Sequence, residues 1–204
     1  ANLQGIWCED IDPIWGSKYT ININTEMNYW MTGPADLPET QLPLFDLLER
    51  MREPGRRTAK AMYGARGYTC HHNTDGFADT APQSHAIGAA VWPLTVPWLL
   101  THVWEHYRFF GDESVLSEHF DMFKEALLFF EDYLFEYQGH LHLPRISTVC
   151  PMGSKETSAF LRLSTIKSCA SFLIAAWISR IFWEIHQILQ IARRRLRAAC
   201  LQQR

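Results

Sequence analysis

Two asparagines, Asn22 and Asn24, stand two residues apart in the stretch YTININTEMNYW, among isoleucines, aromatic residues and one glutamate. Asparagine is unfavourable both in a buried core and in a strand, so two of them in such a stretch require a reason. In an extended chain, side chains two residues apart point to the same side. We therefore expect Ile21 and Ile23 to face a core and the two amides to face the opposite side together.

These two amides have a structural and a functional interpretation. In the first, they satisfy backbone groups in a turn or at a sheet edge. In the second, they line a polar cleft beside the aromatic residues Trp15, Tyr19, Tyr29 and Trp30. A pyranose has apolar C–H faces and a ring of hydroxyls, so a sugar site needs aromatic faces and hydrogen-bonding amides together.

A second group of chemically capable residues lies in the loop HHNTDGFADTAPQ. It holds His71, His72, Asn73, Asp75 and Asp79 within nine residues. Histidine and aspartate are metal ligands, but adjacent histidines in an extended loop point to opposite sides. A metal site is therefore the weakest interpretation. A polar substrate-binding loop and a plain capping loop both remain open.

The sequence HVWEH places two histidines, His102 and His106, four residues apart on a predicted helix. A metalloprotease helix would need the pattern H-E-x-x-H, and here the glutamate, Glu105, does not follow the first histidine. We expect an ordinary helix face with one His–Glu pair. No metal and no cofactor is predicted from any of these motifs.

The composition excludes several classes of protein. The chain of 204 residues is 47% hydrophobic and 20% charged, which is ordinary for a soluble globular domain. Its net charge of −3 gives no indication of nucleic-acid binding. The five cysteines form no C-x-x-C pair, which argues against a zinc ribbon or a thioredoxin-like site.

The elements that must position these residues are predicted to be helices. Residues 1–36 are rich in Trp, Pro, Gly and Asn and are expected to be irregular, with short extended pieces. From Leu37 the apolar period becomes helical, and Pro54 and Gly55 are expected to end the first helix. Its apolar stripe consists of Leu44, Phe45, Leu48 and Met51.

Three further helices are predicted along the chain. One spans 55–67 and ends at Gly64 or Gly67. The next is delayed by Pro93 and Pro97 and ends at Gly111. A strongly amphipathic helix then runs from an N-cap at Asp112 to a stop at Gly139. No strand is predicted after residue 40, so the expected fold class is all-α, built from paired helices.

Several long motifs carry a resemblance to a known family. They are ANLQGIW, WGSKYTININTEMNYW, PLFDLLERM, GRRTAKAMYGARGY, HHNTD, DTAPQ and WEHYRFFGD, in one order from residue 1 to about residue 140. Together they resemble glycoside hydrolase family 95, which comprises mostly α-L-fucosidases with related α-galactosidases. The resemblance implies an (α/α)6 barrel, of which this chain is the first half. The β-domains that flank the family's barrel are not visible here.

The resemblance also implies roles for particular residues. The family inverts the anomeric carbon, which requires an acid and a base about 6.5–9.5 Å apart. An N-x-N pair, matched by Asn22 and Asn24, holds the attacking water, and a downstream Asp makes that water basic. His72, Asn73, Asp75 and Trp92 are expected to bind the substrate, a fucosylated oligosaccharide or glycan. An extracellular location is expected for a full-length relative.

The chain departs from the family at the two carboxylates. The family's general acid is a Glu in a stretch that is occupied here by GHLHLPRISTVCPMGSKE, with Val149 or a neighbour at its place. Glu156 is the nearest carboxylate downstream. The family's base Asp lies in a part that this chain does not contain. We therefore expect an incomplete glycosidase with weak or no activity. The alternative is a non-catalytic sugar-binding or structural helical module.

The last third is expected to differ from the first two. We divide the chain into a half-barrel, residues 1–145, and a divergent helical tail, residues 146–204. The uncharged run Ser168–Ser179 is too short to span a bilayer. Four arginines near the end (Arg193, Arg194, Arg195 and Arg197) could favour an anionic membrane surface, but packing as an ordinary helix is favoured over membrane contact.

Overall fold

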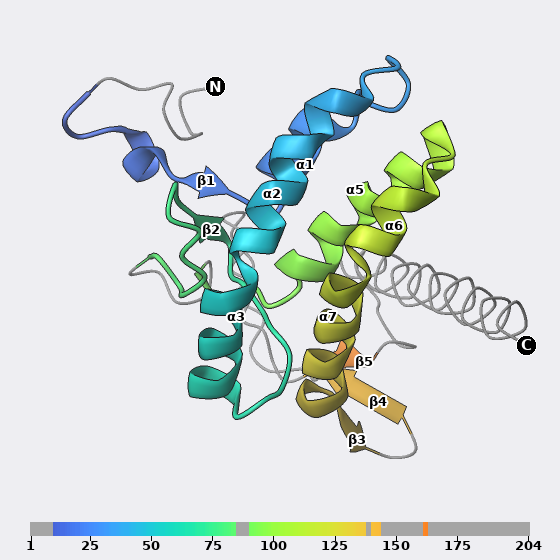
Figure 1. The fold of residues 1–204 in the computed structure, drawn as a ribbon. Helices are drawn as coiled ribbons and strands as arrows, with labels where there is room; N and C mark the ends of the chain where they lie inside the picture. Colours follow the sequence, from blue (N-terminus) through green and yellow to red (C-terminus); the bar gives the residue numbers. More distant parts are fainter. Residues whose placement is uncertain (1–9, 85–89, 138–139, 144–160, 163–204) are drawn as a thin grey trace, which may run out of the picture.

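The computed structural model describes residues 10–84, 90–137, 140–143 and 161–162. These residues are mostly helical, as the sequence predicts (Figure 1). The helices are α1 (Asn24–Tyr29), α2 (Leu42–Arg50), α3 (Arg52–Thr58), α5 (Thr95–Phe110), α6 (Glu113–Glu118) and α7 (Phe120–Tyr133). Shorter turns are the 3-10 segments η2 (Ile14–Ser17) and η3 (Pro38–Gln41), and the π-helical turn η4 (Ala59–Tyr63).

Helices α2 and α3 follow each other almost in line along one side of the molecule (Figure 1). The expected break at Pro54 and Gly55 is wrong, because both residues lie inside α3. Pro54 is the third residue of that helix, where a backbone N–H would have no intrahelical partner to lose. Gly55 lets the helix approach the irregular segment before β2, since a Cβ there would lie 2.9 Å from the carbonyl oxygen of Thr69.

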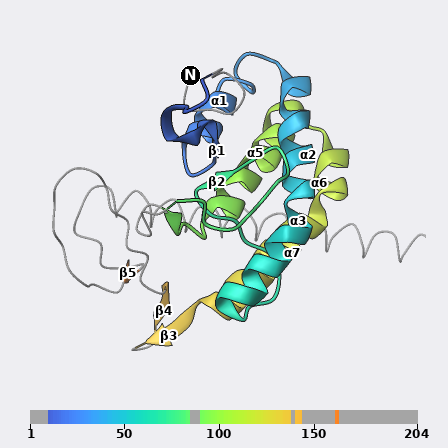
Figure 2. The same ribbon diagram turned by 90° about the vertical axis from the view of Figure 1, so that its left-hand side faces the viewer.

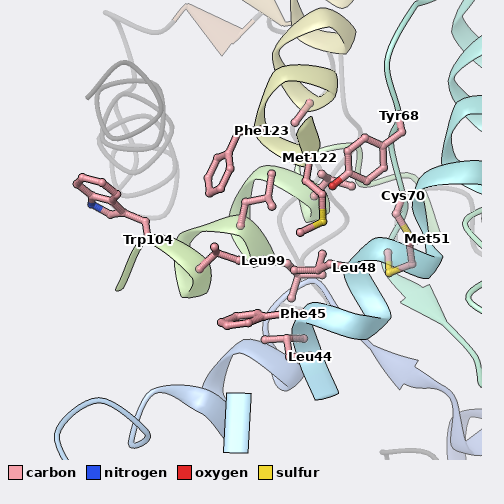
Figure 3. Close-up of a cluster of buried hydrophobic side chains, with 14 of the residues drawn as sticks. Leu44, Phe45, Leu48, Met51, Tyr68, Cys70, Leu99, Trp104, Met122 and Phe123 are labelled. Atoms are coloured by element: carbon pink, nitrogen blue, oxygen red, sulfur yellow. The ribbon is translucent and has the colours of Figure 1, made fainter. Parts of the chain in front are cut away.

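The main core lies between α2, α5 and α7 (Figure 3). The predicted stripe of α2 is confirmed: Leu44, Phe45, Leu48 and Met51 are all at most 1% exposed. They pack with residues from the later helices, among them Leu99, Met122 and Phe123. Full burial of each such side chain contributes roughly 1.5–3 kcal/mol, so this cluster is the main stabilising feature of the fold.

Two predicted helix ends are confirmed. Gly64 caps η4 with φ +63°, and Gly111 caps α5 with φ +70°, both in the left-handed region that favours glycine. Asp112 is the N-cap of α6, as predicted, and its side chain accepts a hydrogen bond from the Ser114 backbone N–H at 2.9 Å.

The predicted single helix from residue 112 to 139 is wrong in two respects. It is divided at His119 into α6 and α7, and α7 ends at Tyr133. The chain then enters strands β3 (Phe135–Tyr137) and β4 (His140–Leu143), which pair antiparallel, and β5 (Leu161–Arg162) adds to β4. Gly139, the predicted stop, lies outside the described residues.

The N-terminal segment is more ordered than the sequence predicts. Strand β1 (Tyr19–Thr20) pairs antiparallel with β2 (Asn73–Thr74), and α1 follows β1 after a three-residue turn. Helix α1 packs against α5 and β1. The strands after residue 40, β2 to β5, are each two to four residues long, which is too short for alternation to reveal them.

Helices α3 and α7 lie side by side in both views (Figures 1 and 2). Arg52 and Arg56 of α3 both bind Glu125 of α7, with nitrogen–oxygen distances of 2.6 Å. Gly67, with φ +66°, lies against the backbone of α7, where a Cβ would collide with the Glu125 carbonyl oxygen. Within the described part of the chain, no helix is both long and apolar enough to cross a bilayer.

Candidate active site

The small sheet β1–β2 joins the two chemically capable stretches. Tyr19 pairs with Thr74, Thr20 pairs with Asn73, and the backbone N–H of Ile21 donates to the His72 carbonyl oxygen at 2.8 Å. The turn that carries Asn22 therefore continues directly from a strand that is bonded to the stretch carrying His72 and Asn73.

The backbone around the asparagine pair differs from the expected strand. Residues 21–23 form a turn and Asn24 is the first residue of α1. Ile21 is fully buried as expected, but Ile23 is only half-buried. Alternation in an extended chain therefore does not fix the two amides on one side. A shared side for them stays a prediction that rests on the family resemblance.

Both asparagine side chains are half-buried, and neither has a hydrogen-bond partner among the described residues. The turn itself is held by its neighbours. The hydroxyl of Thr25 donates to the Thr20 carbonyl oxygen at 2.8 Å, and the Met27 N–H donates to the Ile23 carbonyl oxygen at 2.9 Å.

His71 has a structural role. Its Nδ1 accepts the backbone N–H of Trp92 at 3.1 Å, so the neutral ring carries its proton on Nε2, which faces the Tyr63 hydroxyl at 3.4 Å. Its backbone carbonyl accepts from the hydroxyl of Thr95 at 2.8 Å. Burial, reinforced by His72, lowers the pKa of His71 to about 4, which keeps the ring neutral.

His72 and Asn73 also have spare hydrogen-bonding capacity. The Nδ1 of His72 lies 3.1 Å from the Ala90 carbonyl oxygen and must donate to it, which leaves Nε2 as an acceptor in the neutral ring. Burial lowers the pKa of His72. The side-chain oxygen of Asn73 is buried and has no hydrogen-bond partner among the described residues.

Asp75 holds its own loop. Its Oδ1 accepts the backbone N–H groups of Phe77 and Asp79, at 2.9 Å and 3.2 Å. The guanidinium of Arg50 donates to the Gly76 carbonyl oxygen at 3.2 Å. This pattern matches the capping-loop interpretation for residues 75–79, and substrate binding by His72, Asn73 and Asp75 stays a prediction.

Trp92 is tied to the same region through its backbone rather than its ring. The backbone N–H donates to His71, and the side chain packs against a second apolar cluster. Leu94, Phe129 and Tyr133 belong to that cluster. A stacking role for Trp92 stays a prediction.

One residue near the pair was not predicted as part of a site. Glu26 is 0% exposed, and neither oxygen of its carboxyl has a partner among the described residues. Burial raises its pKa to about 8, with partial opposition from its own backbone N–H. Only Thr25 separates it from Asn24 in the sequence. The structure places Glu26 in α1, where the sequence predicts an extended segment.

The histidines of α5 are buried rather than exposed. The Nδ1 atom of His106 lies 2.7 Å from the side-chain oxygen of Gln41. Neither ring nitrogen of His102 has a hydrogen-bond partner among the described residues. Burial lowers the pKa of His102 to about 4. Across the described ranges, no group of three or more His, Cys, Asp or Glu residues is arranged to hold a metal ion.

Comparison with known proteins decides the family. The glycosyl hydrolase family 95 catalytic domain matches residues 1–199. The chain belongs to glycosyl hydrolase family 95. By that membership it is part of a glycosidase catalytic domain, and the predicted resemblance is confirmed.

Curated relatives of this family 95 chain carry fucosidase names. Alpha-L-fucosidase 2 of Arabidopsis thaliana is 43% identical over 118 residues, which are 58% of this chain and 14% of that protein. Probable alpha-fucosidase A of Aspergillus niger is 35% identical over 119 residues, 57% of this chain and 15% of that protein. The matched part of the chain thus spans about a seventh of the length of these relatives.

Proposed function

We propose that this chain supplies part of the sugar site of an inverting α-L-fucosidase, with Asn22 and Asn24 as the residues that hold the attacking water. The observation that carries the proposal is the β1–β2 pairing within a family 95 domain, because it joins the asparagine turn to His72 and Asn73. The fucosidase names of the relatives support fucose as the sugar.

The chemistry requires more than the two asparagines. An amide carbonyl is far too weak to act as a base, but it orients a water molecule whose proton passes to a carboxylate elsewhere in the enzyme. His72 Nε2 and the Asn73 side-chain oxygen are acceptors that suit sugar hydroxyls. We propose that Trp92 contacts the sugar and that Asp75 contributes to substrate binding by holding the loop of residues 75–79 in place.

The same proposal covers architecture and substrate. We propose that residues 1–145 are the first half of an (α/α)6 barrel; the predicted divergent helical tail, residues 146–204, lies outside the described residues except for residues 161–162. The substrate is a fucosylated oligosaccharide or glycan. We propose that the 204-residue chain by itself is weakly active or inactive, because Val149 or a neighbour stands where the family's general acid is expected.

The test is release of L-fucose from a 2′-fucosylated oligosaccharide, measured beside titration of the chain with L-fucose. We expect saturable fucose binding that Asn24→Ala and Asn22→Ala weaken, and turnover at or near background. Asn28→Ala, an exposed asparagine on α1, is the matched control and leaves binding unchanged.

Positioned acid and base groups each contribute about 10²–10⁴-fold to rate, so the loss of both leaves little turnover. Turnover that Asn24→Ala abolishes would show that Glu156 or another carboxylate has taken over these roles. A chain that binds no fucose, in any variant, would favour the alternative, a structural helical module.

A further inference from the structure

Residues 69–72, which lead into β2, are joined to residues 90–94, which precede α5, by hydrogen bonds that involve side chains. Neither stretch belongs to a strand. The backbone N–H and the Nδ1 of His72 both lie near the Ala90 carbonyl oxygen, at 3.4 Å and 3.1 Å. Because no β-ladder fixes the two stretches, the side chains between them determine how they lie against each other.

His71 makes the contact that places Trp92. Its Nδ1 accepts the backbone N–H of Trp92 at 3.1 Å. A backbone N–H can only donate, so this Nδ1 carries no proton. The hydroxyl of Thr95 donates to the His71 carbonyl oxygen at 2.8 Å and lies 3.1 Å from the carbonyl oxygen of Trp92. The imidazole of His71 and the hydroxyl of Thr95 therefore hold both backbone polar groups of Trp92.

The ring of His71 is itself held in place. It is 0% exposed, and its centroid lies 6.0 Å from that of Tyr63, whose hydroxyl faces Nε2 at 3.4 Å. Tyr63 and Trp92 pack against the same apolar cluster, to which Phe129 and Tyr133 belong. A buried ring with a neighbour at each nitrogen has little freedom to rotate, so Nδ1 is a fixed acceptor for Trp92.

This contact joins the proposed sugar contacts to one another. His71 is followed directly by His72 and Asn73, which carry two of the proposed contacts, and Trp92 is the third. Trp92 is half-buried, so part of its surface can meet a ligand. The hydrogen bond from Trp92 to His71 thus connects the aromatic contact to the residue adjacent to the two polar ones.

We propose that His71 is a positioning residue for sugar binding: its Nδ1 holds Trp92 at a fixed place relative to His72 and Asn73, so that the three side chains bind as one unit. The consequence for the sugar rests on the proposed function. His71 itself makes no contact with the sugar, because its ring is buried and its two nitrogens face Trp92 and Tyr63.

The first test needs no sugar. NMR of the nitrogen-15-labelled 204-residue chain at neutral pH should show an unprotonated Nδ1 in His71. It should also show a scalar coupling between that Nδ1 and the backbone nitrogen of Trp92, which is the signature of an N–H···N hydrogen bond. His106 is the control, since its Nδ1 faces the side-chain oxygen of Gln41 and should show no such coupling. A protonated Nδ1 in His71, or no coupling to Trp92, overturns the proposal.

The second test compares two variants of His71 in their affinity for L-fucose. The Oδ1 of asparagine can occupy the position of Nδ1 and accept the same N–H, so His71→Asn should bind within about threefold of the native chain. His71→Leu has no acceptor and should bind about tenfold more weakly or worse. A role in packing alone gives the opposite order, because leucine suits a buried site better than asparagine does.

Thr95 supplies a second pair of variants for the same measurement. Thr95→Ser keeps the hydroxyl and should bind L-fucose nearly as the native chain does, whereas Thr95→Val keeps the shape and should bind severalfold more weakly. Equal affinities of folded His71→Leu and His71→Asn would contradict the positioning role. A native chain that binds no fucose would remove the proposed function, and the NMR coupling would still decide whether His71 holds Trp92.

Discussion

Buried ionisable residues give this chain two opposing pH dependences of stability. The pKa of Glu26 is raised by burial to about 8, so between pH 4.5 and 8 the unfolded state ionises while the folded state keeps its proton. Stability from this group is fully present below pH 4.5 and is lost as the pH rises toward 8. His71 and His102, with pKa values lowered to about 4, act oppositely and lose stability as the pH falls from 6.5 to 4.

Replacement of Glu26 by glutamine should remove the loss of stability that occurs as the pH rises toward 8. The free energy of unfolding of the native chain is expected to fall between pH 6.5 and 8 by up to about 1.4 kcal/mol per pH unit, and that of Glu26→Gln to stay nearly level. Urea unfolding at several pH values measures this difference. Parallel curves for the two proteins would show that Glu26 ionises normally in the folded state.

At the scale of elements, the features that depend on local periodicity and capping are predictable from the sequence. The stripe of α2, the N-cap Asp112 and the glycine stops at 64 and 111 all depend on residues within one or two turns. The sheet β1–β2 is not predictable in this way, because its two strands are far apart in sequence and each is only two residues long. The burial of Glu26 is likewise not predictable from local sequence, because it is a property of the tertiary fold.

The same distinction between local and tertiary features applies to the candidate site. Polar residues in apolar surroundings and long family motifs predict the site residues Asn22, Asn24, His72 and Asn73. Their connection through β1 and β2 needs the tertiary fold. Asp75 shows the limit of residue type alone, because a loop aspartate that caps two backbone N–H groups and one that binds a sugar have the same appearance in a sequence.

The core stripe of α2 allows a matched comparison of two leucines. Leu48 is 0% exposed and Leu42, on the same helix, is 48% exposed. We expect Leu48→Ala to lower the free energy of unfolding by about 2–5 kcal/mol, because it leaves a cavity, and Leu42→Ala to lower it by less than about 1 kcal/mol. Chemical denaturation of both variants measures the two costs. Equal costs would mean that α2 does not form the core described here.

Alanine substitutions at two glycines in the left-handed region distinguish the cost of the backbone conformation from the cost of a steric clash. Gly64 and Gly67 have φ values of +63° and +66°, but a Cβ at Gly64 meets open space while one at Gly67 meets the backbone of Glu125 and Phe129. Gly64→Ala should cost about 1 kcal/mol, the penalty of the left-handed conformation alone. Gly67→Ala should cost at least about 2 kcal/mol more, since backbone atoms of α7 must move. Thermal unfolding of the pair tests whether α7 packs on this turn.

At the scale of the whole molecule, an ionic cluster joins elements that are distant in sequence. Glu125 of α7 receives hydrogen bonds from Arg52 and Arg56 of α3. Burial opposes ionisation of Glu125, but these two arginines outweigh it and lower its pKa. The side chains of Arg52 and Glu125 are only 17% and 16% exposed, so water screens this pair less than a surface pair.

Loss of the Glu125 charge should therefore lower the stability of the domain. We expect Glu125→Gln to lower the free energy of unfolding by about 1–3 kcal/mol. The control is Glu131→Gln, also on α7, whose 62% exposed side chain binds Arg66; it should cost no more than about 0.5 kcal/mol. Denaturation at low salt compares the two. A Glu131→Gln cost as large as that of Glu125→Gln would contradict a special role for the α3–α7 cluster.

The pairing of β1 with β2 also has a consequence for the order of folding. It closes a loop of about 50 residues through only two residue pairs. The closure entropy of such a loop is roughly 3–4 kcal/mol, which two short strands do not offset alone. Helices α2, α5 and α7 should therefore collapse first, and the segment with Asn22, Asn24 and Glu26 should dock afterwards. Pulsed hydrogen exchange during refolding should find the amide of Ile21 protected later than that of Leu48, so that the residues assigned to the sugar site are the last to reach their places.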